Sequence, residues 1–181
     1  MKIKHTFIST AVCFVACTGL LSFTANAQKA TNLTDPEIAS IAVTANQIDI
    51  DYAKIAETKT KNQDVLNFAQ TMAKDHQSVI DQAVALVTKL GVTPKDNATS
   101  KSLKAGEAKT KKLLESKSGK AFDKAYIDNE VGYHKAVIKE VETALIPDAQ
   151  NAQLKGLLQS VLPVLKQHLS HAEMVQKELK K

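Results

Sequence analysis

The stretch VLNFAQTMAKDHQSVIDQAVALVTKL, residues 65–90, decides the fold of this chain. Apolar residues recur in it every three or four positions, which is the spacing that places side chains on one face of an α-helix. Asn62 precedes the stretch as a helix cap, and Gly91 follows it as a stop signal. His76 departs from the pattern, because it occupies a position in the apolar seam. The stretch therefore predicts a long helix with an ionisable side chain on its buried face.

The same spacing continues through most of the chain beyond residue 34, and no segment shows a convincing strand alternation. Predicted helices cover about residues 35–60, 62–90, 121–145 and 149–180, with a weaker lysine-rich helix near 100–117. The four long helices have roughly 25 to 30 residues each, or about 40 Å at 1.5 Å per residue. We expect an all-α fold, a ferritin-like four-helix bundle with a short extra helix in the crossover.

Each predicted long helix carries an ionisable residue on its apolar face. These are Asp49, His76, His134 and His168, in chain order. Burying such groups costs several kcal/mol unless they are paired or bound to something. Four of them on four helices predict a polar centre inside the bundle.

The heights of these residues along the first hairpin agree. Asp49 and His76 lie about 18 and 22 Å from the turn near Lys61, at about 1.5 Å per residue. We therefore expect them at the same level of the bundle.

The second hairpin is less regular. Counted from Pro147, His134 lies about 20 Å away and His168 about 30 Å away, at about 1.5 Å per residue. Glu130, one turn before His134, comes closer to the height of His168. We therefore expect Glu130 to pair with His168, and His134 to be peripheral unless a kink at Pro163 brings it in.

The inward residues form a candidate metal site. Neutral imidazole suits copper, zinc and iron alike. A ferroxidase centre is disfavoured, because neither of the Glu-x-x-His pairs of di-iron bundles is present. Asp75 points about 100° away from its neighbour His76, so it is better suited to orient or shield than to share a metal. The predicted ligands are Asp49, His76, Glu130, His134 and His168. The alternative is that these groups hydrogen-bond one another and fix helix register without a metal.

The first 27 residues read as a signal peptide. Lys2 and Lys4 form a basic start, an apolar run covers residues 10–23, and Ala25-Asn26-Ala27 offers a cleavage site. We expect an exported protein, periplasmic or associated with the outer membrane. A less favoured alternative is a lipoprotein anchored through Cys17.

Residues 28–181 would then form one bundle domain. Both cysteines, Cys13 and Cys17, leave with the signal peptide, so this domain has no disulfide and no thiolate ligand. No later stretch is apolar for the roughly 20 residues that a membrane span needs.

The composition disfavours nucleic-acid binding. The formal net charge is +5, but all basic residues are lysines and the chain has no tryptophan. Such a chain lacks the bidentate forks and stacking platforms that nucleic acids require. The lysine-rich stretch 101–124 is expected to be mostly a solvated face, with contact to an acidic envelope surface as the alternative.

Three ordered blocks resemble a known family. FAQTMAKDH at 68–76 resembles its FAxxMxxDH signature, FDKAY at 122–126 its second block, and LPVLKQHL at 162–169 its LPxLxxHL block. The chain is similar to the bacterial exported domain of unknown function 4142. This resemblance implies a ferritin-like fold and, from the family's frequent label of putative outer-membrane protein, a location. Asp49 stands where that family usually has a glutamate.

Three functional hypotheses follow. The first is a non-enzymatic envelope or stress-related binding protein with a buried histidine and carboxylate metal site. The second is a structural or interaction module of the cell envelope without a metal. The third is a metal-dependent oxidase. Hydrolase motifs such as Gly-x-Ser-x-Gly and His-Glu-x-x-His do not occur in the sequence.

Overall fold

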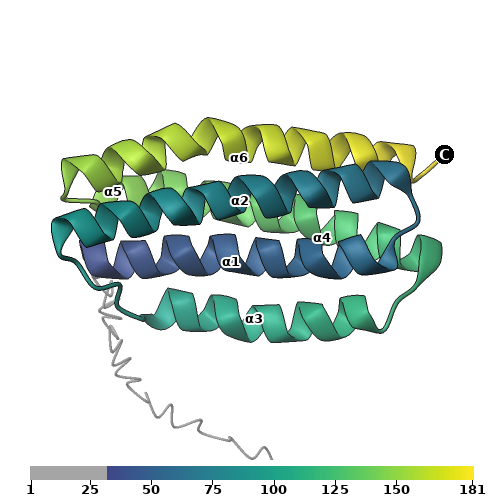
Figure 1. Ribbon diagram of the computed structural model, residues 1–181, viewed down its shortest axis with the longest axis horizontal. Coiled ribbons are helices and arrows are strands. Elements are labelled where there is room, and N and C mark those ends of the chain that lie inside the picture. Colours follow the sequence, from purple (N-terminus) through teal and green to yellow (C-terminus); the bar gives the residue numbers. More distant parts are fainter. Residues whose placement is uncertain (1–31) are drawn as a thin grey trace, which may run out of the picture. The chain divides into compact units, whose positions relative to one another are not determined.

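The computed structural model describes residues 32–181, and they form a bundle of helices (Figure 1). Its helices are α1 (Asp35–Lys59), α2 (Gln63–Leu90), α3 (Ala98–Glu115), α4 (Gly119–Glu140), the π-helical turn η1 (Val141–Leu145), α5 (Ile146–Asp148) and α6 (Ala152–Glu178). Residues 32–181 contain no strand. The all-α prediction and the extra helix in the crossover are confirmed. The predicted signal peptide and Cys17 lie outside the described residues.

Side chains next to the helix starts fix where the long helices begin. Thr34 and Glu37 form a capping box at α1. Asn62 accepts hydrogen bonds from two backbone amides at the start of α2, and Asn151 does the same for α6. Such caps satisfy amides that have no partner within the helix. None of the helices in the described part of the chain is long and apolar enough to cross a membrane.

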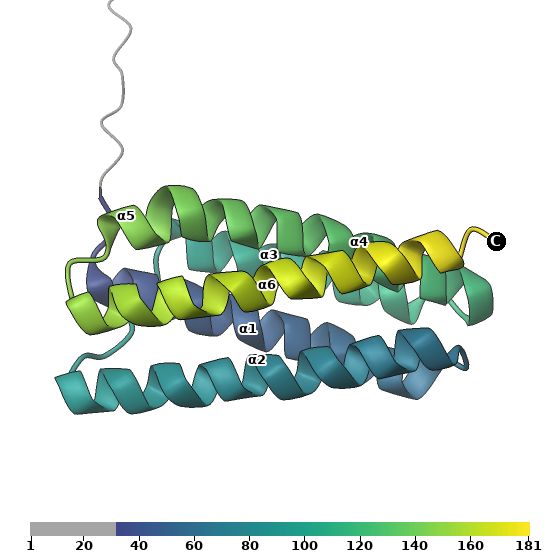
Figure 2. The same cartoon turned by 90° about the horizontal axis from the view of Figure 1, so that it is seen from above.

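Two helical hairpins, α1 with α2 and α4 with α6, make up the bundle (Figure 2). In the chain α3 connects the two hairpins, and Figure 1 shows it running back along α1, so that α2 and α4 run in the same direction. At one end of α1, Thr60 Oγ1 donates to Asp123 Oδ1 at 2.6 Å. At the other end, the Leu33 amide donates to Asp148 Oδ2 at 2.9 Å. These contacts hold α1 antiparallel to α4.

The second hairpin begins and ends at different residues from those predicted. Its helix begins at Gly119 rather than Ala121, and the glycine adopts φ +53°, a left-handed conformation that costs other residues energy. Helical backbone then continues through η1 and α5 to Asp148 instead of stopping before Ile146. The loop before α6 therefore lies later in the chain than the sequence indicated.

The apolar core has two parts, which lie on either side of the polar residues along the helices. One part holds most of the large aromatic side chains, and its buried members include Tyr52, Val65, Phe68, Met72, Phe122, Tyr126 and Val175. The other is aliphatic and includes Ile38, Ile41, Ile138, Val141, Leu145, Leu154, Leu158 and Leu165. The polar centre therefore lies between two apolar layers.

We expect Phe68→Ala to destabilise the protein by about 3–5 kcal/mol, because the side chain is fully buried and its removal leaves a cavity. Urea unfolding followed by circular dichroism measures this. Leu113→Ala is the control, because Leu113 is half exposed and its loss should change stability by less than about 0.5 kcal/mol. Equal effects of the two substitutions would contradict the assigned core.

Candidate metal centre

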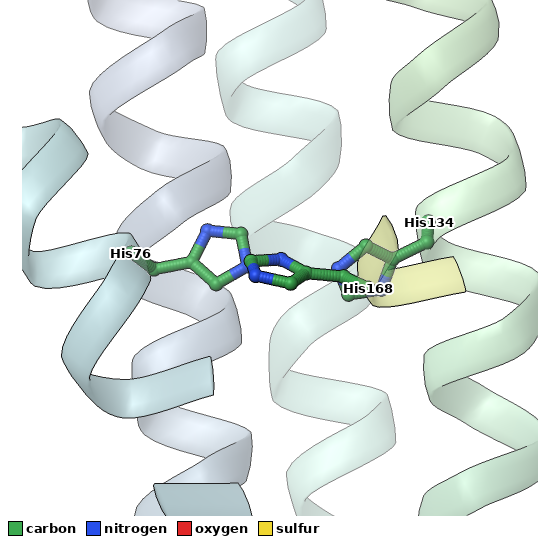
Figure 3. A group of neighbouring side chains, drawn as sticks. All are labelled: His76, His134 and His168. Carbon is green, nitrogen blue, oxygen red and sulfur yellow. The ribbon is translucent and has the colours of Figure 1, made fainter. Parts of the chain in front are cut away.

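The five residues predicted as ligands meet at one level of the bundle. Asp49 comes from α1, His76 from α2, Glu130 and His134 from α4, and His168 from α6. All five are buried, and the carboxyl-bearing residues Asp49 and Glu130 are 0 % exposed. Figure 3 shows the three imidazole rings gathered between the helices that carry them. The fold therefore brings together residues that are up to 119 positions apart in the sequence.

Two groups of three residues have the spacing of metal ligands. His76, His134 and His168 can each place a ring nitrogen within 4.8 Å of the other two. Asp49, Glu130 and His134 form a second such group within the same distance. The two groups share His134, so all five residues belong to one cluster.

His134 lies at the centre of this cluster. Its Nε2 is 3.6 Å from Asp49 Oδ2, and the same oxygen is 3.4 Å from His76 Nε2. The ring centroid of His134 lies 5.6 Å from those of both His76 and His168. The expectation that His134 is peripheral was wrong.

The reason lies in the loop before α6. Because helical backbone continues to Asp148 and α6 begins only at Ala152, His134 and His168 lie nearly the same number of residues from the loop. Counting from Pro147 therefore overestimates the difference in height between the two histidines. The helix α6 continues without a break through Pro163.

Asn46 holds the ring of His76 from outside the cluster. The Asn46 side-chain amide donates through Nδ2 to the Ala42 carbonyl at 2.8 Å, which turns its oxygen toward the histidine. That oxygen is 2.7 Å from His76 Nδ1, so Nδ1 must be the donor. The other ring nitrogen, Nε2, therefore carries the lone pair, and it faces Asp49.

The other two rings are held in the same manner. His134 Nδ1 donates to the backbone carbonyl of Glu130 at 3.0 Å. His168 Nε2 donates to Asp75 Oδ2 at 3.1 Å. Asp75 therefore orients a histidine rather than sharing a metal with His76. The histidine that it orients is His168 of α6. In each ring one nitrogen is bound at the periphery and the other is left for the interior.

The inward-facing atoms of the cluster have no hydrogen-bond partner. Within residues 32–181, seven buried side-chain atoms lack one, and six of these belong to the predicted ligands. The six are Asp49 Oδ1 and Oδ2, His76 Nε2, Glu130 Oε2, His134 Nε2 and His168 Nδ1. An unsatisfied buried polar group costs about 1–3 kcal/mol. Such a concentration at one place indicates that a further group belongs there.

Burial also sets the protonation of the cluster. It raises the pKa of Asp49 to about 8, and burial together with the neighbouring Asp49 charge raises the pKa of Glu130 well above its usual value. Burial lowers the pKa of His134 to about 4 and that of His76 well below 6.5, and it also lowers the pKa of His168. At neutral pH the imidazoles are therefore uncharged and keep free lone pairs.

Sequence reasoning missed one neighbour of the cluster. Asn46 shares a helix face with Asp49 three residues later, which is a signal that could have been used. Tyr126 has a buried hydroxyl without a hydrogen-bond partner, and burial and the Glu130 charge raise its pKa. The hydroxyl of Tyr133 donates to the Ala45 carbonyl at 2.9 Å.

The family model described as "Domain of unknown function (DUF4142)" matches residues 21–175, a range that includes the whole cluster. The chain belongs to this DUF4142 family. It matches no curated protein and no solved structure. The match confirms the family that the three sequence blocks resembled. The family description names no function, so the chemistry of the cluster is inferred from its geometry.

We expect the metal-free protein to lose stability as the pH rises from about 7.5 to 8.5. In this range Asp49 binds a proton in the native state, with a pKa of about 8, but not in the unfolded state, with a pKa near 3.8. The histidines are neutral in the native state, and at pH 7.5 and above they are about nine-tenths neutral in the unfolded state, where their pKa is near 6.5, so they offset little of this loss. Urea unfolding in the presence of a chelator measures the effect.

Asp49→Asn should flatten this pH dependence, since it removes the carboxyl group. Asp51→Asn is the matched control, because Asp51 lies near the surface, and a hydrogen bond from Gln47 and an ion pair with Lys111 lower its pKa, so it stays ionised throughout this range. Identical slopes in the two variants would contradict the assignment of a raised pKa to Asp49.

Proposed function

We propose that this protein is a non-enzymatic metal-binding protein that holds a transition-metal ion at the centre of its bundle. The observation that carries the proposal is that the two nitrogens of each imidazole ring have different environments. Each ring has one nitrogen in a peripheral hydrogen bond and the other free in the buried interior. Metal-binding histidines are held in this way, because the outer hydrogen bond fixes both the tautomer and the ring orientation.

The donor atoms favour copper, zinc or iron. Three neutral imidazole nitrogens with one or two carboxylates suit these ions, whereas calcium and magnesium prefer oxygen ligands. The charge also balances, because Asp49 and Glu130 would together neutralise a divalent cation. Without a cation, two adjacent buried carboxylates repel each other and one or both hold a proton.

The same contacts argue against a purely structural polar network. In such a network the inward histidines and carboxylates would hydrogen-bond one another across the core. Here His76 and His134 approach Asp49 at 3.4 and 3.6 Å, but the facing atoms make no hydrogen bond. The satisfied contacts all point outward, so a bound ion accounts for the inner atoms better than a self-contained network does.

The alternative of docking through lysine-rich α3 receives less support. Lys111 pairs with Asp51 and Glu107 at 3.1 and 3.4 Å, and Lys104 pairs with Asp96 at 3.1 Å. These ion pairs reduce the positive field that an acidic surface would meet.

The proposed place of action is outside the cytoplasm, in the periplasm or at the outer membrane. The support is the signal-peptide pattern of residues 1–27. Fractionation of cells that produce the protein, with mass measurement of its N-terminus, tests this. A cytoplasmic protein that retains Met1 would overturn the proposed location.

We expect the protein, purified without a histidine tag, to bind copper, zinc or iron stoichiometrically after equilibration and removal of free metal. His76→Ala and His168→Ala should each weaken binding by at least about 100-fold, because each removes one ring nitrogen from the set of donors. Elemental analysis with competition by chelators of known affinity measures this, and circular dichroism checks the fold. His171→Ala is the control, because His171 lies one turn from His168 and packs against Phe68 outside the cluster. A folded wild type that binds no metal would refute the proposal.

Asp75→Asn should weaken metal binding by about 10–100-fold, since Asp75 orients His168 without belonging to the ligand groups. The exposed Asp81 on the same helix gives the control Asp81→Asn, which should bind like the wild type. The same chelator competition provides the measurement. An unchanged affinity in Asp75→Asn would show that the ring of His168 needs no outer partner.

A further inference from the structure

A cavity of about 230 Å³ adjoins the candidate metal centre inside the aliphatic part of the core. Asp49, His76 and His134 line its inner end. Aliphatic side chains from α1, α2, α4 and α6 form most of the remaining wall, among them Ala45, Ala83, Val137, Leu158 and Leu165. The apolar cavity and the polar cluster are therefore continuous.

The cavity is elongated along the bundle. On α1 its lining runs from Asp49 back to Ala39, and on α2 it runs from His76 forward to Val87. At 1.5 Å per residue both stretches are about 15 Å long. An apolar cavity of about 150 Å³ stays dry and binds benzene. This cavity is larger and drawn out in one direction, so a chain fits it better than a ring.

We propose that the cavity binds a medium-length fatty acid, with its tail along the aliphatic wall and its carboxylate at Asp49, His76 and His134. With C–C bonds of about 1.5 Å in a zigzag, which advance about 1.3 Å each, an extended chain of about twelve carbons spans 15 Å. Small-molecule sites combine a mostly apolar wall with a few polar groups at one place. The proposed binding site for the alkyl tail depends only on the cavity. The proposed position of the carboxylate rests on the proposed function, because a bound metal ion would attract the negative carboxylate.

The length of the cavity makes the first test quantitative. Hexanoate, octanoate, decanoate and hexadecanoate are titrated into the protein by isothermal calorimetry. Affinity should rise about fourfold per methylene up to decanoate, which corresponds to burying each methylene. It should rise no further for hexadecanoate, because the chain would outgrow the cavity. A saturable site without this dependence on chain length, or no binding to folded wild type, would overturn the proposal.

Two cavity-filling variants locate the tail. Ala45 and Ala83 are buried and line the cavity, so Ala45→Leu and Ala83→Leu should weaken decanoate binding by at least about tenfold. Ala85→Leu is the matched control, because Ala85 lies two residues further along α2 on its exposed face. Circular dichroism confirms that all three fold. Equal affinities in Ala83→Leu and Ala85→Leu would overturn the assigned site.

Further titrations test the fatty-acid site separately from the metal site. They also show whether the bound acyl chain belongs to a free fatty acid or to a lipid. Decanoate and decanol are compared with and without bound metal, and metal should strengthen decanoate binding more than decanol binding. Decanoyl lysophosphocholine should bind at least tenfold more weakly than decanoate, because its head group is too large for the inner end. If it binds equally well, the ligand is a lipid acyl chain entering from outside, and the position of the carboxylate is overturned.

The two proposals can therefore fail separately. Metal binding without decanoate binding would overturn the fatty-acid site and leave the metal site. Decanoate binding that Ala83→Leu removes, in a protein that binds no metal, would overturn the metal site and the position of the carboxylate, and support the tail site.

Discussion

The burial of Asp49 beside Glu130 and three imidazoles is the constraint on which the rest of the structure depends. An apolar core has no solvent to satisfy these groups, so each must find a partner inside the protein or remain costly. The outward-facing nitrogens of the rings find partners in Asn46, Asp75 and a backbone carbonyl. The inward-facing atoms do not. The cluster is therefore held by hydrogen bonds on its outer side, while its inner atoms have no hydrogen-bond partner.

The bundle architecture supports this arrangement. Each of the four long helices contributes at least one group, and the caps and cross-links at the helix ends fix the heights at which these groups meet. A helix that shifted by one turn would move its group about 5 Å along the bundle axis and out of the cluster. The contacts at Thr60 and Leu33, far from the cluster, therefore also position it.

The two parts of the core have different roles. Large aromatic side chains such as Phe68, Phe122 and Tyr126 fill the part on one side of the cluster. On the other side the side chains are aliphatic and include small residues such as Ala45 and Ala83, which line the cavity. These small side chains leave a volume unfilled, whereas most protein cores are closely packed. Packed aromatic side chains thus lie on one side of the cluster, and the apolar cavity lies on the other.

The sequence by itself determined the helical fold and the identity of the inward ionisable residues. Apolar spacing of three and four residues depends only on local helix geometry, so the positions of Asp49, His76, His134 and His168 on buried faces could be predicted. Only the tertiary structure decided that His134 lies at the centre, since its height depends on where the loop before α6 falls. Tertiary contacts also decided which nitrogen of His76 and His168 is free, because Asn46 and Asp75 reach those rings from other helices. The cavity likewise depends on how four helices pack, which no single segment encodes.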